Sequence, residues 1–425
     1  MEKIIRAMEK CGVSTWRLTR EHTQAVELYY IRKQLDIPRV RELSLVRAEV
    51  FRDFEEDGNK FRGSAEIFIE PGMTDDEIAG RIRDAYYAAS FVKNPFYELP
   101  APTADGEVLR AGEGFGEMTP AAVAAAAGEV LLSGSGDDTA FINSAEIFAS
   151  RRRVQIRDSK GTNVSYDADS LSGEFVAQCI SPEDVEQFRQ FSYQEADLAS
   201  LREKLEEGIR DVRLRSQAAA APKTGKYDII LTAENLREIL GFYLQRSSSA
   251  MIYPQYSTWK TGDNVQGEMG GGERLNLTLQ PTFPCSSEGI PLRPRPLLED
   301  GKLCTIHGNS RNAYYLGIEP TGEYEKLSLD AGTLSLEEMR RPGTLEAVSF
   351  SDFQMDAMDG HFAGELRLGL LTGEDGKRVP LTGGSINGSL LDAQGKLIFS
   401  KERYRDSAYE GPLAVLIPGV TVAGE

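Results

Sequence analysis

The spacing of apolar residues in the first 100 positions predicts strands followed by a helix. Thr74 and Glu77 have the three-residue separation of a capping box at a helix start. Ile78, Ile82 and Ala85 then recur at helical spacing, which indicates one buried helix face. Before them, β-branched and aromatic residues partly alternate with polar ones, as in half-buried strands, over three segments: 26–32, 45–54 and 64–69.

The chain from 101 to 222 repeats this order. A loop over 94–116, rich in glycine and proline, leads to an alanine-rich helix that opens at Thr119. Ser181 is a helix cap with Pro182 at the first helical position, which predicts a helix from there. A further helix carries an apolar stripe from Leu198 to Val212. Three strands are predicted between the first two helices: 144–149, 153–158 and 174–179.

The two halves of this region share an order and a tetrapeptide. Ala-Glu-Ile-Phe occurs at 65–68 and again at 145–148. A weak internal duplication of a sheet-plus-helix unit explains the repeat, and so do chance and shared structural class. We divide the chain into an N-terminal α/β domain over 1–100, a second α/β region over 101–222, and a third domain over 223–425.

The third domain is predicted to be rich in strands. A buried strand over 227–231 feeds a helix that Thr232 can cap, with Leu236, Ile239, Leu240 and Tyr243 on one stripe. Short apolar runs, separated by glycine- and proline-bearing turns, follow at 275–279, 313–317, 347–350, 365–371, 397–400 and 413–417. The fold class is therefore α+β: an N-terminal α/β region of sheet-plus-helix units followed by a β-rich C-terminal domain.

Composition narrows the function classes. The formal net charge of −18 disfavours nucleic acid and anionic lipid as partners, because both are polyanions. Arg151–Arg153 is the one tight basic cluster, interpreted as a solvated strand edge. No apolar stretch reaches the ~18 residues that span a bilayer, and the N-terminus does not have the pattern of a signal peptide. Four scattered cysteines suggest reduced thiols and a cytoplasmic location.

The predicted helix after Thr232 contains the hexamer Arg237-Glu238-Ile239-Leu240-Gly241-Phe242. It resembles the zinc motif His-Glu-x-x-Gly-His of the TldD/PmbA family of peptide-processing proteins. The resemblance covers nearly the whole chain and is closer to the PmbA/TldE-like branch. Further matching segments lie at 143–148, 157–161, 286–291, 307–311, 320–322, 350–362, 382–388 and 418–424.

The resemblance implies a metallopeptidase-related protein whose metal ligands are missing. In zinc-bearing members the two histidines of the motif and a cysteine near the C-terminal end hold the metal, and the glutamate acts on a water. Here Arg237 and Phe242 replace the histidines, and no cysteine follows Cys304. We therefore expect no cofactor and no cleavage by this chain alone. Glu238 would be either a polar contact in a peptide groove, paired with Arg237, or an exposed helix carboxylate.

Two other sites are considered. Asp352, Asp356, Asp359 and His361 crowd one short stretch and could bind a metal, or could face water in a loop. A peptide could also add to an exposed strand edge beside aromatic walls, although aromatic residues of a β-rich domain more often form its core and the histidines can be structural. The residues assigned to peptide binding are Tyr253, Tyr256, Trp259, His307, Arg311 and His361.

The leading hypothesis is a non-catalytic, TldE-like protein of cytosolic proteolysis or peptide maturation. It would bind peptide or a TldD-like partner subunit, and the family's paired subunits imply a homo- or heterodimer. One alternative is an active metallopeptidase that uses the cluster around His361. Another is a regulatory protein that acts as a modulator of DNA gyrase, without direct contact to nucleic acid or membrane.

Overall fold

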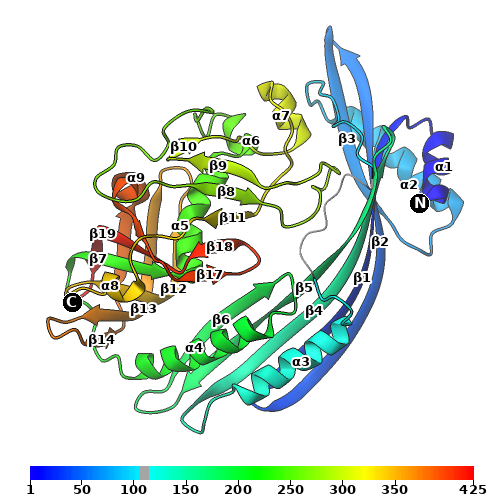
Figure 1. Cartoon of the computed structure of the whole chain (residues 1–425). Helices are drawn as coiled ribbons and strands as arrows, with labels where there is room; N and C mark the ends of the chain where they lie inside the picture. Colours follow the sequence, from blue (N-terminus) through cyan, green and yellow to red (C-terminus); the bar gives the residue numbers. More distant parts are fainter. Residues whose placement is uncertain (105–113) are drawn as a thin grey trace.

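One long, curved antiparallel sheet forms the N-terminal part, with strand order β3-β2-β1-β4-β5-β6 (Figure 1). The computed structural model describes residues 1–104 and 114–425, so residues 105–113 of the predicted loop lie outside the described residues. Strands β1 and β2 both run further than predicted. Their ends carry polar side chains and therefore lack the apolar pattern used for the prediction. The strands are β1 (Thr15–Ile31), β2 (Gln34–Glu56), β3 (Asn59–Ile69), β4 (Ala140–Asp158), β5 (Asn163–Cys179) and β6 (Val185–Tyr193).

Helices cover one face of this sheet. Trp16 and Leu18 of β1 are buried in a cluster with α1 (Glu2–Lys10) and α2 (Asp75–Ala88). Leu28 and Tyr30, further along the same face of β1, are buried in a cluster with α3 (Pro120–Ser133) and α4 (Leu198–Ser216). A short 3-10 turn, η1 (Ala89–Phe91), follows α2. The opposite face, which carries Arg17 and Thr19, is left for the C-terminal part.

The structure contains the predicted capping box. Thr74 Oγ1 accepts a hydrogen bond from the Glu77 N–H at 3.3 Å, and the Glu77 carboxylate accepts one from the Thr74 N–H at 2.8 Å. Both halves of the N-terminal part then have the order helix, three strands, helix among the described residues. The repeated tetrapeptide, however, falls on edge strand β3 and on inner strand β4, which are not equivalent positions.

Two expectations for this region are wrong. No helix begins at Ser181: β6 starts at Val185, because Gln187, Phe191 and Tyr193 bury alternate side chains as a strand requires. The packing of these residues outweighs the local capping signal. The arginine cluster is also not at an edge, since β4 lies between β1 and β5. Its cations pair across strands, with Arg151 2.7 Å from Asp169, Arg153 2.8 Å from Asp167 and Arg152 3.6 Å from Glu21.

Two further sheets form the C-terminal part, which lies within the curve of the first sheet (Figure 1). One is mixed, with order β10-β9-β8-β11-β18-β17. The other has order β12-β7-β19-β15-β13-β14, and an additional β12–β13 pairing closes five of its strands into a ring. The strands are β7 (Gly225–Thr232), β8 (Leu277–Gln280), β9 (Arg295–Glu299), β10 (Lys302–Leu303), β11 (Lys326–Leu329), β12 (Leu345–Met355), β13 (His361–Thr372), β14 (Arg378–Leu381), β15 (Ser385–Ser389), β16 (Ile398–Phe399), β17 (Arg403–Arg405), β18 (Tyr409–Pro412) and β19 (Ala414–Ala423).

Helix α5 (Ala233–Arg246) lies in the centre of this part, and one large cluster of buried residues joins it to strands of both sheets. The α+β class with a β-rich C-terminal part is confirmed. The other helical segments are short: α6 (Ser249–Ile252), α7 (Ser310–Leu316), α8 (Leu336–Met339), α9 (Leu390–Ala393) and η3 (Gln394–Lys396). Among the described residues, no helix has the length and apolar character needed to cross a membrane.

The apolar run at 313–317 was expected to be a strand. This expectation is wrong, because the run forms the end of α7. The Asn309 side chain accepts a hydrogen bond from the Asn312 N–H at 2.9 Å and caps the helix start. Gly317 closes the helix in the left-handed conformation, at φ +67°. Both signals are visible in the sequence and outweigh the apolar composition between them.

Candidate functional site

The position of α5 follows from its sequence. Strand β7 runs directly into the helix, and the chain turns at Ala233, which has a φ of +46°. Thr232 occupies the N-cap position, but its side chain makes no capping hydrogen bond. The predicted stripe is confirmed, because Leu236, Ile239, Leu240 and Tyr243 are all fully buried. The apolar face therefore fixes the orientation of the helix and directs the hexamer's polar positions outward.

Arg237 lies on the outer side of α5 and binds a carboxylate. Its Nη1 is 2.8 Å from Oδ2 of Asp406, just after β17. Asp406 is almost buried, and its Oδ1 accepts hydrogen bonds from the N–H groups of Ala408 and Tyr409, both at 2.8 Å. Tyr404 donates to Oδ2 at 3.3 Å. One interpretation expected Arg237 to pair with Glu238, but Arg237 pairs with Asp406 instead. Glu238 is an exposed helix carboxylate.

A polar pocket of about 530 Å³ surrounds this ion pair, between β5, β6, α4, α5 and the β17 segment. Its charges neutralise one another. Lys204, nearly buried, forms an ion pair with Glu234; burial opposes ionisation of Glu234, but Lys204 outweighs it and holds the pKa of that carboxyl below its usual value. Nearby, burial raises the pKa of Asp211 to about 6 although Arg189 lies 2.9 Å away.

Phe242, at the second ligand position, is part of the core. Its side chain is 1% exposed, and its ring centre lies 5.3 Å from that of Tyr243 and 5.7 Å from that of Trp259. The Arg246 guanidinium lies 5.6 Å from the Phe242 ring and 5.2 Å from the Trp259 ring, a cation–π arrangement. An aromatic cluster thus fills the place where a zinc ligand would be needed.

These residues do not fit a zinc ion. A guanidinium cation repels the metal, a phenyl ring has no donor atom, and the chain has no cysteine after Cys304. Within residues 1–104 and 114–425, no group of three or more His, Cys, Asp or Glu side chains is arranged to hold a metal. No chemical step through zinc follows from this helix.

The acidic stretch before β13 uses its carboxylates in local turns. Asp356 accepts a hydrogen bond from the Met358 N–H at 2.7 Å, and Asp359 accepts one from the His361 N–H at 2.9 Å. Asp352 accepts one from the Gln354 side chain. His361 is exposed, and its Nε2 is 3.1 Å from Asn387 Oδ1. In the described ranges these side chains do not gather as a set of metal ligands.

The residues assigned to peptide binding do not form one surface. His307 is 4% exposed, with Nε2 2.9 Å from the Leu244 carbonyl oxygen, and burial lowers its pKa. Trp259 is half-buried against the core. Tyr253 and Tyr256 are exposed, and the Tyr253 ring packs 4.9 Å from that of Tyr315. Of the six, Arg311 lines a pocket in contact with the N-terminal sheet.

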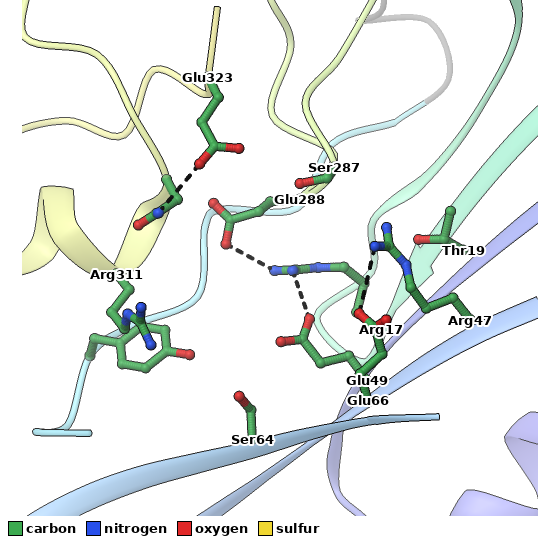
Figure 2. A pocket seen from close by; sticks show the side chains of 12 residues that line it. Arg17, Thr19, Arg47, Glu49, Ser64, Glu66, Ser287, Glu288, Arg311 and Glu323 are labelled. Carbon is green, nitrogen blue, oxygen red and sulfur yellow. Dashed lines mark hydrogen bonds and ion pairs between the residues drawn. The ribbon is translucent and has the colours of Figure 1, made fainter. Parts of the chain in front are cut away.

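This second pocket, which we call the sheet–loop pocket, has a volume of about 270 Å³ (Figure 2). It lies between the open face of β1–β3 and loops of the C-terminal part. The strands contribute Arg17, Thr19, Arg47, Glu49, Ser64 and Glu66, and the remaining lining residues are Tyr97, Ser287, Glu288, Asn309, Arg311 and Glu323.

Arg17 holds the two sides of the sheet–loop pocket together. It is 7% exposed and lies 3.0 Å from Glu49 and 3.4 Å from Glu288 (Figure 2). Glu288 also accepts hydrogen bonds from the N–H and hydroxyl of Ser310, at 2.6 and 2.7 Å. Burial raises the pKa of Glu49, although Arg17 opposes this.

Sequence reasoning missed the strand residues of this pocket. A signal for them exists in β1, where polar Arg17, Thr19 and Glu21 alternate with apolar Trp16 and Leu18. This alternation marks a polar sheet face, but the partners of that face come from distant loops.

Comparison with known proteins agrees with the fold. Residues 224–424, which hold the strand ring and α5, match the family model of the PmbA/TldA metallopeptidase C-terminal domain. The β-rich half is thus a metallopeptidase-related domain of this class. Residues 224–424 therefore carry a C-terminal domain of the TldD/PmbA type. A comparison with curated protein sequences gave no match.

Solved structures extend the likeness to the whole chain. TldE from Thermococcus kodakarensis superposes with a TM-score of 0.80 at 16% identity and covers 100% of both chains. A Thermotoga maritima protein described as a candidate modulator of a DNA gyrase gives 0.79 at 16% identity, with 99% of each chain covered. A similarly described Bacteroides thetaiotaomicron protein gives 0.76 at 16% identity, covering 100% of this chain and 98% of the other. At this identity the likeness shows the fold alone.

Proposed function

We propose that this chain is a non-catalytic, TldE-like subunit that supports peptide processing by binding peptide or a TldD-like partner in the cytoplasm. One observation carries the proposal: both histidine positions of the family's zinc motif have structural duties. Arg237 is committed to Asp406, and Phe242 is fully packed between Tyr243 and Trp259. A polar ligand in place of Phe242 would disturb the core, and Arg237 already holds the carboxylate of Asp406.

A role beside a catalytic partner explains why the chain keeps the architecture without the ligands. Zinc peptidases need three protein ligands and an activated water, whereas holding an extended peptide or a second subunit needs only a shaped surface. We therefore propose a homo- or heterodimer, with no cofactor in this subunit. The resemblance in fold to proteins described as candidate modulators of DNA gyrase does not carry that activity to this chain.

Metal analysis and a peptidase assay test the proposal together. The purified protein, incubated with zinc and dialysed, should retain less than about 0.1 zinc per chain and should not cleave a mixed peptide library. Mixed with a TldD-like protein that has an intact motif, it should co-elute in size-exclusion chromatography and raise that partner's cleavage rate. Near-stoichiometric zinc together with cleavage by the chain alone would overturn the proposal and favour the metallopeptidase alternative.

A further inference from the structure

Arg311 is the one cation of the sheet–loop pocket that lacks a carboxylate partner within the described residues. Its Nη1 donates to the Asn94 side-chain oxygen at 3.2 Å, and no acidic oxygen lies within 4 Å of it. By contrast, Arg17 has two glutamates, and Arg47 lies 3.6 Å from Glu66. The half-buried Arg311 guanidinium therefore retains free donors that face the cavity (Figure 2).

The carboxylates of the pocket already have hydrogen-bond or ion-pair partners. Glu49 and Glu288 both form ion pairs with Arg17, and Glu66 forms one with Arg47. Glu323 accepts a hydrogen bond from the Asn309 amide at 3.4 Å. An incoming ammonium group would compete with these partners. A carboxylate would instead find Arg311 uncompensated.

Neutral donors surround the same space. The hydroxyls of Thr19, Ser64 and Ser287 make no hydrogen bond in the part of the chain that the structure describes. Burial raises the pKa of Tyr97 to about 12, so its phenol stays protonated and can donate. The lining has four glutamates against three arginines, which penalises a doubly charged phosphate more than a singly charged carboxylate.

The size of the pocket indicates a chain end. Its ~270 Å³ lies just below the range of about 300–1,000 Å³ usual for whole small-molecule sites. A third pocket, of about 260 Å³, adjoins it and shares Thr19, Arg47, Ser287 and Glu323. Val154, Ile156, Phe283 and Leu292 give that neighbour one apolar wall, and Glu21, Arg152 and Glu325 also line it. Together the two pockets offer a polar end and a partly apolar continuation.

We propose that the sheet–loop pocket binds the C-terminal carboxylate of a peptide. Arg311 holds the carboxylate, the free hydroxyls bond the last peptide group, and apolar side chains before the terminus enter the neighbouring pocket. The peptide bridges the N-terminal sheet and the C-terminal loops. This inference rests on the peptide-binding arm of the proposed function and adds the site and the recognised chemical group.

Fluorescence anisotropy with fluorescein-labelled hexapeptides ending in Phe-Leu tests the assignment. The label blocks the N-terminus, so the free acid and the C-terminal amide differ only at the end in question. The wild-type chain should bind the acid about tenfold to a hundredfold more tightly than the amide, as a charge-assisted hydrogen bond provides. Arg311→Gln should remove this preference, and Arg311→Lys should restore part of it. Arg341→Gln, at an exposed arginine beyond α8, is the matched control and should leave the preference unchanged.

Several outcomes would overturn the assignment. One is equal affinity of the wild type for acid and amide, or no binding of either. Another is a preference that survives Arg311→Gln in a variant with an unchanged melting temperature. N-acetyl-leucine that competes as strongly as the hexapeptide would show a site for free acids rather than chain ends. Each of these results would leave the metal and peptidase tests of the non-catalytic role untouched.

Discussion

Arg237 of α5 and Asp406 beyond β17 are 2.8 Å apart, and the two oxygens of Asp406 have separate tasks. Oδ2 receives Arg237, while Oδ1 accepts two backbone N–H groups of the loop that leads into β18. The carboxylate thereby ties the outer side of the central helix to the mixed sheet. The position that the family's zinc motif gives to a histidine is used here to fasten the helix.

This division of tasks predicts unequal effects of removing the two partners. Arg237→Gln should change the free energy of unfolding by about 0–1 kcal/mol, because the guanidinium is partly exposed. Asp406→Ala should cost about 2–4 kcal/mol, because it leaves two buried N–H groups and a cation without an acceptor. Urea denaturation measures both. Equal losses would contradict the central role given to Asp406.

Restoring the motif should not restore the metal. In an Arg237→His/Phe242→His double variant the third ligand is still missing, so elemental analysis should find no tightly bound zinc. The second substitution also places an imidazole in an aromatic core, which should lower stability by about 2–4 kcal/mol. Phe242→Leu, which keeps the site apolar, is the control and should lose less. Stoichiometric zinc in the double variant would show that another ligand lies within reach.

Asp211 predicts a pH dependence of stability. Its pKa rises from an ordinary 3.8 to about 6 on folding, so between these values the folded chain holds a proton that the unfolded chain has lost. Stability contributed by this group is therefore complete below about pH 4 and declines as pH rises through about 6. The decline amounts to about 1–3 kcal/mol. The difference in unfolding free energy between wild type and Asp211→Asn should shrink or reverse accordingly across this interval. A constant difference would contradict the shift.

Cys285 should be chemically inert in the folded protein. It is 1% exposed, and burial raises the pKa of its thiol to about 12, so almost no thiolate exists at pH 8. Iodoacetamide should modify the half-buried Cys11 well before Cys285, as followed by mass spectrometry of native protein. In urea the two thiols should react at similar rates. Rapid native labelling of Cys285 would show that the neighbouring pocket opens.

Local patterns predicted the elements whose signals are local. The stripe from Leu236 to Tyr243 and the capping box at Thr74 depend on residues within one or two helical turns, and both are present. The segment after Ser181 became a strand because Phe191 and Tyr193 pack against a core that includes α4, which forms later in the chain. A short-range signal could not reveal that competition.

For the same reason, only part of the candidate site could be predicted from the sequence. Arg237 and Phe242 could be identified as poor metal ligands from chemistry alone, but their partners Asp406 and Trp259 depend on the fold. The sheet–loop pocket joins Glu49, Glu288 and Arg311, which are far apart in sequence. Alternation in β1 marks one wall of this pocket, while the opposite wall comes from distant segments of the C-terminal part.

The N-terminal sheet has a seam at its middle, where β1 and β4 run side by side in opposite directions from Arg17↔Asp158 to Ile31↔Ser144. Each helix–three-strand–helix half supplies one of these two strands. A fragment that began after residue 101 would leave β4 with a bare row of backbone donors and acceptors, and a second molecule could fill it. The first hundred residues are therefore an integral half of one continuous sheet and not a removable module.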